Sequence, residues 1–392
     1  MAGPSDLVSL DAAQPTIWDG IVIGAGPAGA MAARQLALAG RRVLLVEKKR
    51  FPRWKICGAC LNGQALAALR SAGLGSVVTR LGGIGLKNLQ VGFRGRMARV
   101  AVPDGASVSR SRLDAALVEA ATDAGAGFLQ ETQAVVGKLF DGVRMVRLIQ
   151  QGRSIDVSGR VVLVASGLGG VRQDDGSVAK TRIRAGSRIG AGCLVASAPV
   201  FYEERTIFMA VGREGYVGLV RVEDGSLNLA AAFEPACVRQ WGSPARAAAA
   251  ILTEAGFPSI AALEGAHWQG TAGLTRRTLP VAEERLFLLG DAAGYVEPFT
   301  GEGIAWALAS GQAVAPLAAQ AMERWEPRIG RAWSDLHRRL IGRRQLICRA
   351  IALMLKRPCL ASIGFEVMSR SPASARFVVR RLNAPPSFTN AS

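Results

Sequence analysis

Short apolar runs separated by alanine-rich stretches dominate the hydrophobic pattern of this chain. The runs are Ile21–Ile23, Val43–Val46, Val161–Ala165 and Leu286–Leu289, and each is brief and uninterrupted. Strands buried on both faces of a parallel sheet have this pattern. The stretch Ala30–Ala39 has the composition of a buried helix and is followed by Gly40. The alternation of such strands and helices predicts an α/β fold.

Other segments alternate apolar and polar positions, which is typical of half-buried strands. We predict strands of this kind at Val91–Val102, Phe208–Val220 and Leu227–Phe233. A hairpin is expected over Ala134–Asp156, with Asp141-Gly142 as its turn. Helices are predicted over Leu61–Ala72 and from Ser109 to Ala124. These segments predict a second, mixed β-sheet beside the parallel one.

One strand–turn–helix segment contains a glycine pattern. Gly24, Gly26 and Gly29 have the G-x-G-x-x-G spacing between the first strand and its helix, and Glu47 ends the next strand. Gly24 permits a tight turn, a side chain at Gly26 would block a pyrophosphate, and Gly29 lets the helix pack closely. The helix N-terminus offers N–H groups to phosphates, and Glu47 can accept hydrogen bonds from ribose hydroxyls. The segment therefore predicts a dinucleotide site.

A second candidate contact lies far downstream. The strand Leu286–Leu289 leads into Gly290-Asp291, and this carboxylate can accept hydrogen bonds from ribityl hydroxyls. The segment Pro298–Ile304 then enters another alanine-rich helix, whose N–H groups can stabilise negative charge on a reduced flavin. A cofactor with a long ribityl arm suits two contacts so far apart in sequence. We therefore predict FAD, bound non-covalently in an extended form.

Three motifs together resemble a known family. They read G-A-G-P-A-G from Gly24, F-P-R-W-K-I-C-G from Phe51 and L-L-G-D-A-A-G-Y-V-E-P-F-T-G-E-G-I from Leu288. This set resembles the FAD-dependent geranylgeranyl reductases, which belong to the p-hydroxybenzoate hydroxylase-like flavoproteins together with aromatic hydroxylases and flavin halogenases. The resemblance covers Trp18 to Ala315, is strong at both ends and is poorly specific for substrate, because many chemistries share this scaffold.

The motifs and the resemblance imply a Rossmann-like FAD-binding domain, a mixed β-sheet substrate domain and a helical C-terminal region. We expect the FAD-binding domain to comprise residues 17–75, 106–170 and 275–320, the substrate domain 76–105 and 171–274, and the C-terminal region 321–385. The cofactor-binding residues so predicted are Gly24, Gly26, Pro27, Ala28, Gly29, Glu47, Lys48, Lys55, Arg110, Gly167, Gly290, Asp291, Pro298, Gly301, Gly303 and Ile304.

Two positions leave alternatives open. Arg110 matches a family motif in which the arginine lies beside FAD, but Arg110 and Asp114 can equally form an i,i+4 pair on a helix surface. Ser166 stands where related hydroxylases carry an aspartate that helps to hold FAD and the nicotinamide nucleotide. We expect NAD(P)H as the electron donor, either directly or through a partner reductase.

Few residues offer conventional acid–base chemistry. The chain has only two histidines, His267 and His337, so a histidine-based mechanism is disfavoured and the flavin must carry the chemistry. Cys57 and Tyr216 are the candidate catalytic residues, since each matches a flavin-proximal family segment. Cys57 and Cys60 also satisfy C-x-x-C, which is compatible with simple packing, a redox dithiol or, least of all, a metal site. We predict no metal.

The leading function is an FAD-dependent oxidoreductase that reduces a C=C bond of an isoprenoid or lipid-like chain. Lys55, Cys57 and Gly58 match the family and favour reduction, whereas Gly218 replaces a family tryptophan and predicts a wider pocket there. The alternatives are a monooxygenase that hydroxylates an aromatic or polyketide-like ring, a flavin-linked dithiol oxidoreductase using Cys57 and Cys60, and a non-enzymatic membrane-associated binder. Halogenation is disfavoured because the sequence lacks a W-x-W-x-I-P segment.

Charge and cysteine content limit the partners. Six scattered cysteines in 392 residues do not suggest a disulfide scaffold, and no run of 18 apolar residues is free of charge, so we expect a cytoplasmic protein. The net charge is +18, but arginines are not interleaved with aromatics, which argues against nucleic acid. Residues 324–381 hold 14 Lys or Arg against three Asp or Glu. This basic region predicts a structural cap or a peripheral contact with a membrane or an acidic carrier protein.

Overall fold

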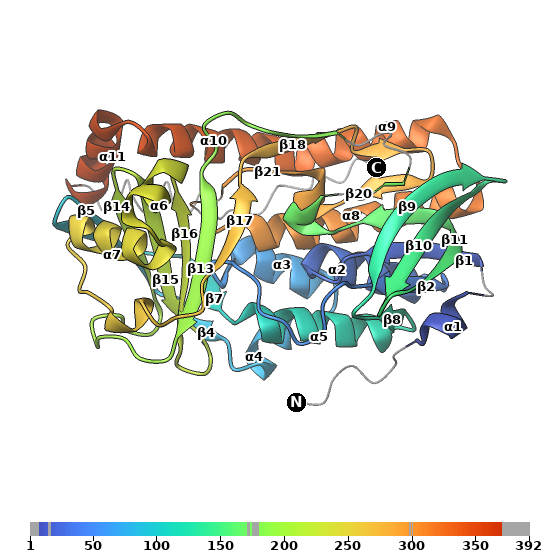
Figure 1. Ribbon diagram of the computed structural model, residues 1–392, viewed down its shortest axis with the longest axis horizontal. Coiled ribbons are helices and arrows are strands. Elements are labelled where there is room, and N and C mark those ends of the chain that lie inside the picture. The colour runs from blue at the N-terminus through green and yellow to red at the C-terminus, as the bar shows by residue number, and fades with distance from the viewer. Residues whose placement is uncertain are drawn as a thin grey trace.

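Two large sheets lie along the long axis of the molecule, and helices from the C-terminal part of the chain run past both of them (Figure 1). This computed structural model describes residues 8–14, 17–170, 173–174, 180–297, 299 and 301–370. The predicted α/β class with a second sheet and a C-terminal helical region is confirmed.

The first sheet contains the parallel strands predicted from the apolar runs. Its strand order is β19 (Ala282–Glu283), β20 (Leu286–Leu288), β11 (Arg153–Val164), β1 (Ile17–Ile23), β2 (Val43–Val46) and β8 (Gly127–Leu129). The antiparallel strands β10 (Val143–Gln150) and β9 (Gln133–Phe140) continue from β11. The carboxyl ends of parallel β1 and β11 meet at one edge, because Ile23 pairs with Val164. Ligands bind at this edge in open α/β sheets.

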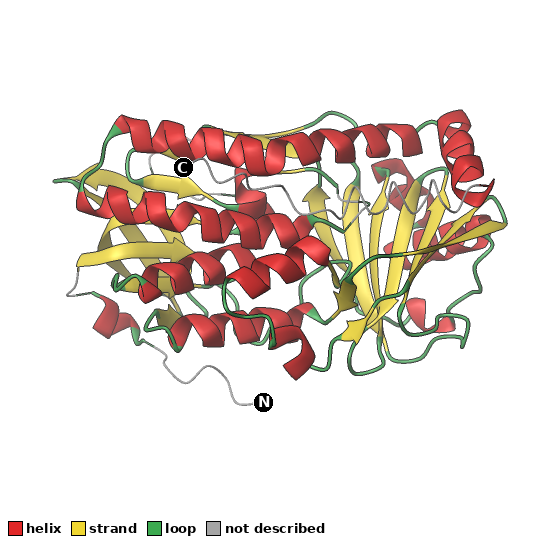
Figure 2. Ribbon diagram, turned by 180° about the vertical axis from the view of Figure 1, so that it is seen from behind, coloured by secondary structure: helices red, strands yellow, loops and turns green. Residues whose placement is uncertain are grey.

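Three helices pack beside this sheet. They are α2 (Pro27–Leu38), α5 (Arg110–Thr122) and α8 (Gly303–Glu323), and Figure 2 shows the helical layer from behind. α2 and α8 approach very closely, since a Cβ on Gly311 would lie 2.3 Å from the Ala28 carbonyl oxygen. Proline is favourable at the first position of a helix, which explains why α2 begins at Pro27, three residues before the predicted start.

The second sheet is mixed and has seven strands. Their order is β17 (Gln269–Gly273), β13 (Ile189–Val195), β16 (Leu227–Phe233), β15 (Gly215–Arg221), β14 (Thr206–Gly212), β5 (Asn88–Phe93) and β6 (Arg96–Ala101). Only β14 and β5 pair in parallel within this order. α6 (Pro235–Trp241) and α7 (Pro244–Ala255) lie at one side, and α7 packs into the core behind the sheet. The opposite face of the sheet is turned toward the cavity described below.

Two small sheets connect the large ones. The first comprises β3 (Cys60–Asn62), β7 (Gly105–Ser107) and β4 (Ile84–Gly85), and the second comprises β12 (Lys180–Ile183), β18 (Arg276–Leu279) and β21 (Gly294–Tyr295). The remaining short helices are α1 (Leu10–Ala13), α3 (Gly63–Ser71), α4 (Val77–Arg80) and the 3₁₀ turns Gly167–Gly169, Ala261–Leu263 and Gly290–Ala293.

The C-terminal helices form a layer along the top of Figure 1. α9 (Pro327–His337) continues through a π-helical turn (Arg338–Gly342) into α10 (Arg343–Leu355), and α11 (Pro358–Arg370) follows. α11 lies beside β5 and β6 at the far end of the second sheet. The predicted C-terminal region continued to residue 385, and its part after Arg370 lies outside the described residues.

Two segments differ from the predicted elements. The helix expected from Leu61 begins at Gly63, because Leu61 and Asn62 pair with β7 and the Asn62 side chain accepts a hydrogen bond from the Ala65 N–H as the N-cap. The predicted hairpin and the following strand form a single meander. Its turn is at Asp141-Gly142 as predicted, and β11 runs unbroken from Arg153 to Val164.

Candidate functional site

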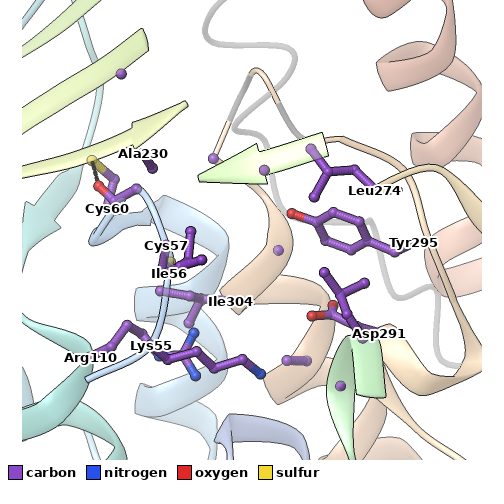
Figure 3. A pocket seen from close by; sticks show the side chains of 18 of the residues that line it. Lys55, Ile56, Cys57, Cys60, Arg110, Ala230, Leu274, Asp291, Tyr295 and Ile304 are labelled. Atoms are coloured by element: carbon purple, nitrogen blue, oxygen red, sulfur yellow. Dashed lines mark hydrogen bonds between the residues drawn. The ribbon is translucent and has the colours of Figure 1, made fainter. Parts of the chain in front are cut away.

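A large cavity lies where the two sheets and the C-terminal helices meet. Its volume is about 1080 Å³, at the upper end of the range for ligand pockets. Its lining includes every predicted site residue except Gly29, which packs behind it, and Pro298, which lies outside the described residues. Figure 3 shows Lys55, Cys57, Arg110, Asp291 and Ile304 around this space.

The glycine-rich turn forms one end of the cavity. Gly24 has φ +102°, and a Cβ there would lie 2.5 Å from the Ala165 carbonyl oxygen. A Cβ on Gly29 would lie 1.8 Å from the Gly24 oxygen, so this glycine permits α2 to pack against β1. At Gly26, by contrast, the nearest atoms are two arginine nitrogens at 3.8 Å. A side chain at Gly26 would therefore enter the cavity instead of the protein core.

Glu47 closes the turn on its other side. Its carboxylate accepts hydrogen bonds from the N–H groups of Ala25 and Lys49, each at 3.0 Å. These bonds fix the side chain at the end of β2, where it lines the cavity. Oε2 also accepts a hydrogen bond from Arg53 at 3.5 Å, whereas Oε1 retains capacity for a further hydrogen bond, such as one from a ribose hydroxyl.

Two arginines converge beside Gly26. Arg110 donates two hydrogen bonds to Asp114, from Nε at 2.8 Å and from an Nη at 2.7 Å, and Arg53 donates a third to the same carboxylate at 3.0 Å. Although burial opposes its charge, Asp114 raises the pKa of Arg110. The predicted i,i+4 pair of Arg110 and Asp114 exists, but it is buried and not on a helix surface. Arg110 also lines the cavity, and its predicted place beside FAD stays a prediction.

Lys55 and Asp291 come from opposite sides of the cavity. Lys55 Nζ lies 2.7 Å from the position of a Cβ on Gly167, and Asp291 belongs to the turn after β20. Burial and the neighbouring Arg110 lower the pKa of Lys55, whereas burial raises that of Asp291 against the opposing effect of Lys55. Within the described part of the chain, neither side chain forms a hydrogen bond or salt bridge. Both polar groups therefore face the cavity without a protein partner.

The N-terminus of α8 reaches the same space as that of α2. Gly303 and Ile304 begin α8 and line the cavity, together with Gly301, which has φ +72°. In the described chain no side chain caps either helix. N–H groups at two helix starts are thus available to a ligand with negative charge at two points. Lys48 extends this basic environment, with its Nζ 3.5 Å from a Cβ position on Gly169.

The other end of the cavity is apolar. Alternate residues of β5, β14, β15 and β16 face it, among them Val91, Met209, Gly218 and Ala230, while the residues between them pack into the core behind the sheet. The helices α10 and α11 cover this face with Ile351, Met354, Leu355, Phe365 and Met368. Gly218 also lines this end, but Met209 Sδ lies only 3.1 Å from its Cβ position, so Met209 occupies space directly beside it. The wider pocket expected at Gly218 stays a prediction.

Tyr216 lies between the polar and apolar ends. The Arg188 guanidinium is 5.6 Å from its ring centre, and the Phe299 ring meets it edge-on at 5.1 Å. Arg188 is itself fixed by an ion pair with Glu297 at 3.0 Å. Burial raises the pKa of Tyr216 well above its ordinary value, and Glu297 contributes to the same effect. The hydroxyl therefore keeps its proton at neutral and mildly alkaline pH.

Tyr295 is a cavity residue that the sequence reasoning missed. It follows the Gly290-Asp291 motif, lines the cavity in Figure 3, and has a pKa that burial and Asp291 raise. In the described residues, neither Tyr216 nor Tyr295 uses its hydroxyl in a protein hydrogen bond, whereas Tyr202 donates to the Pro258 carbonyl at 2.6 Å. Tyr295 belongs to the third motif quoted above, and this was the sequence signal that could have identified it as a cavity residue.

Cys57 and Cys60 are both free thiols at the cavity wall. The Cys57 side chain contributes to the raised pKa of Arg110, and Cys60 Sγ donates to the Gly58 carbonyl at 3.1 Å. Burial strongly raises the pKa of the Cys60 thiol, and Cys57 adds to this effect. Because a thiolate is the reactive form, this environment disfavours a redox role for Cys60.

These residues fit FAD. The cradle at Gly26, the helix start of α2 and the adjacent arginines suit a pyrophosphate, and Glu47 suits a ribose. Asp291 has the acceptor oxygens that a ribityl arm requires. The N-terminus of α8 suits the electron-rich edge of a reduced flavin ring. The fit does not depend on any single residue, because polar groups from four separate segments face one cavity.

A family model described as an FAD binding domain matches residues 18–321. The chain belongs to this FAD-binding family. It is an FAD-dependent oxidoreductase, and the predicted resemblance to the geranylgeranyl reductases is confirmed. Among its relatives is a menaquinone reductase from Mycobacterium tuberculosis, 26% identical over 92% of this chain and 90% of the relative. A digeranylgeranylglycerophospholipid reductase from Methanoculleus marisnigri is 25% identical over 77% of each chain.

Solved structures share the fold of this FAD-dependent enzyme. A geranylgeranyl bacteriochlorophyll reductase-like protein from Thermoplasma acidophilum has a TM-score of 0.73 at 18% identity, covering 94% of this chain and 97% of the other. A flavin-dependent brominase has a TM-score of 0.76 at 19% identity, covering 94% of both. At such identities the likeness shows the fold alone, so it does not choose between reductase and halogenase chemistry.

Two further properties of the described residues concern membrane spanning and metal binding. No helix within the described ranges is long and apolar enough to span a bilayer. The same residues contain no group of three or more His, Cys, Asp or Glu side chains placed to hold a metal ion.

Proposed function

We propose that this enzyme reduces carbon–carbon double bonds in the isoprenoid chain of a lipid. The main observation in favour is that a single cavity has one polar end, which suits FAD, and one apolar end, on the face of the second sheet. A long hydrocarbon chain can lie on that face with one double bond beside the flavin position. The names of the relatives denote lipids with long isoprenoid chains, which supports the same substrate class.

FAD held at the polar end would, when reduced, provide the hydride for one carbon of the double bond, and a residue of this chain would provide the proton for the other. Tyr216 is the proposed proton donor, because it lines the cavity and its raised pKa keeps it protonated. Arg188 and Phe299 hold the ring of Tyr216 in place. Cys57 is the alternative donor at the opposite wall. NAD(P)H, directly or through a partner reductase, is the proposed electron source.

The apolar walls have a second task in this proposal. Side chains from β5, β14 and α11 surround the chain of the substrate and exclude water from the reacting carbons. Exclusion of water protects a reduced flavin site from side reactions and strengthens electrostatic contacts within it. Lys55, Arg110 and the helix start of α8 stabilise the negative charge of the reduced cofactor.

A substitution at Gly218 tests the proposal. Gly218→Trp introduces a large side chain into the chain-binding part of the cavity, away from the glycine-rich turn. We expect FAD content to remain at the wild-type level, while the two-dalton mass gain per reduced double bond in a prenyl lipid falls at least about tenfold. Gly218→Ala, which adds only one methyl group near the flexible Met209, is the matched control and should keep most activity.

Two outcomes of assays with the wild-type enzyme would contradict the proposal. If wild-type enzyme with reduced FAD gives no saturated product from prenylated quinones or glycerolipids, reduction of this substrate class is wrong. If the product instead contains an added oxygen atom, the monooxygenase alternative replaces it.

A further inference from the structure

Exposed apolar side chains are concentrated in one part of the described chain. Fifteen large apolar residues are exposed, and six of them lie in α10 and α11: Leu346, Ile347, Leu353, Leu360, Ile363 and Val367. The other nine are spread between residues 17 and 279. Single exposed apolar residues are ordinary on a protein surface, whereas a cluster indicates an interaction site.

These residues occupy one face of each helix. In α10, Leu346, Ile347, Ala350 and Leu353 lie at i, i+1, i+4 and i+7 and share one face, and Ile351 and Leu355 on the other side line the cavity. In α11, Leu360, Ile363 and Val367 lie at i, i+3 and i+7 and likewise share one face, while Ala361 and Phe365 are buried. Each helix is thus apolar both toward the cavity and toward solvent. A helix that only capped the cavity would have a polar outer face.

Positive charge brackets the exposed stripes. Arg343 and Arg357 lie at the two ends of the stripe on α10, and Arg370 lies at the end of that on α11, all three exposed. The acid within these helices is Glu366, which pairs with Arg96 and Arg370. Arg343 and Arg357 have no acidic partner among the described residues, so the remaining exposed charge on this face is basic.

The cavity reaches the surface at the same place. Val367 is 52% exposed and also lines the cavity, so the apolar interior and the exposed stripe of α11 are continuous there. Figure 1 shows α10 running along the top of the second sheet and α11 at the outer end of that sheet, whereas α2 lies beside the first sheet. An apolar chain entering at Val367 would meet the apolar end of the cavity first.

We propose that the outer faces of α10 and α11 are a membrane-docking surface that binds an anionic bilayer and admits lipid chains to the cavity beside Val367. Apolar residues flanked by arginines suit the interface between acyl chains and anionic headgroups, where a helix lies parallel to the membrane. A second copy of this chain fits less well, because a symmetric contact would bring arginine against arginine. The admission of substrate rests on the proposed function, but binding to the bilayer does not.

Flotation of the full-length, FAD-loaded enzyme with lipid vesicles tests this surface. We expect binding to vesicles of phosphatidylcholine with phosphatidylglycerol, weaker binding to phosphatidylcholine alone, and release at high salt. Leu346→Glu together with Leu353→Glu should lower the affinity at least about tenfold, since two apolar contacts become charged. Phe140→Glu, which changes a 71% exposed residue on β9 remote from these helices, should bind like wild type.

A second variant separates charge from apolar contact. Arg343→Gln with Arg357→Gln should reduce binding to anionic vesicles several-fold and should remove most of its salt dependence. Folding of each variant is checked by FAD content and thermal unfolding, which should match wild type because the altered side chains are exposed.

Three results would overturn the docking surface. They are an absence of vesicle binding by wild type, equal binding by the Leu346/Leu353 double variant, and a wild-type dimer in solution that this variant converts to a monomer. Activity distinguishes failure of the proposed function. If vesicles bind as expected but no prenyl lipid is reduced even in detergent, the docking surface stands and the reductase proposal fails.

Discussion

At the scale of single residues, the position of Tyr216 in the cavity supports its proposed role as the proton donor. It is one of two tyrosines that line the cavity, and its ring lies beside the buried Arg188. The ion pair between Arg188 and Glu297 fixes that arginine. Tyr216 is therefore both preorganised and protonated, which are the two requirements for a general acid.

Removal of this hydroxyl should impair turnover more than binding. We expect Tyr216→Phe to lower kcat by about 10²- to 10⁴-fold with little change in FAD content or KM. Because the pKa of Tyr216 is raised, wild-type kcat should stay level through neutral and mildly alkaline pH and fall only in strong alkali. Steady-state kinetics across pH measure both effects, and the alkaline fall should be absent from the residual activity of the variant.

Three matched variants make this prediction specific. Tyr202→Phe removes a hydroxyl that donates to Pro258 outside the cavity, so it should cost about 1 kcal/mol of stability and leave kcat unchanged. Tyr295→Phe tests whether the second cavity tyrosine shares the role. If Tyr216→Phe keeps full kcat while Cys57→Ser loses it, the proton donor is Cys57 and the assignment of Tyr216 is wrong.

At the scale of elements, the close packing of α2 against α8 sets the FAD-binding end of the cavity. The backbone of Ala28 approaches Gly311 so closely that any side chain there meets a carbonyl oxygen at 2.3 Å and the Cβ of Met31 at 3.0 Å. A shift of α2 would move the helix start that the proposed pyrophosphate contact requires.

Gly311→Ala should therefore destabilise the protein and weaken its hold on FAD. We expect a loss of about 1–3 kcal/mol in the free energy of unfolding, because the contact is with backbone that cannot easily move. Gly330→Ala in α9 is the control, since its Cβ would have ordinary contacts of 3.4 Å or longer. Denaturant unfolding and FAD fluorescence measure the two quantities. Equal stability of the two variants would contradict the role given to this packing.

The elements that sequence reasoning predicted well are those specified by local pattern. The strand at Ile21, the helix after Gly26 and the turn at Asp141-Gly142 each depend on neighbours in sequence, and each is present. Leu61 was misassigned because the partner strand β7, more than forty residues away, determines its conformation. Local pattern alone could not indicate such a pairing.

The candidate site also combines features set by local sequence with features set by contacts between distant segments. The glycines and Glu47 belong to one continuous motif, so their proximity was predictable from spacing. The pairing of Arg53 with Asp114, the stacking of Arg188 on Tyr216 and the place of Tyr295 depend on contacts between distant segments. The C-terminal helices were expected as a cap or a membrane contact, and only the structure shows that α10 and α11 are each apolar both toward the cavity and toward solvent.

At the scale of the whole molecule, one cavity of about 1080 Å³ joins three parts of the protein. The first sheet and its helices provide the polar end, the second sheet provides an apolar wall, and the C-terminal helices cover that wall (Figures 1 and 2). A cofactor and a hydrocarbon chain can therefore meet at Tyr216 without exposure to bulk water. The proposed reaction requires the cofactor and the substrate chain to be in contact within this cavity.

Anaerobic stopped-flow absorbance tests most directly whether the reduced cofactor reacts with the lipid. The FAD-loaded enzyme is first reduced chemically and is then mixed, without oxygen, with a prenylated lipid in detergent. The account predicts that the yellow oxidised flavin returns at a rate that saturates with lipid concentration, that the lipid gains two daltons per turnover, and that Gly218→Trp abolishes this phase. Reoxidation that requires oxygen, whether or not the lipid is present, would contradict the account.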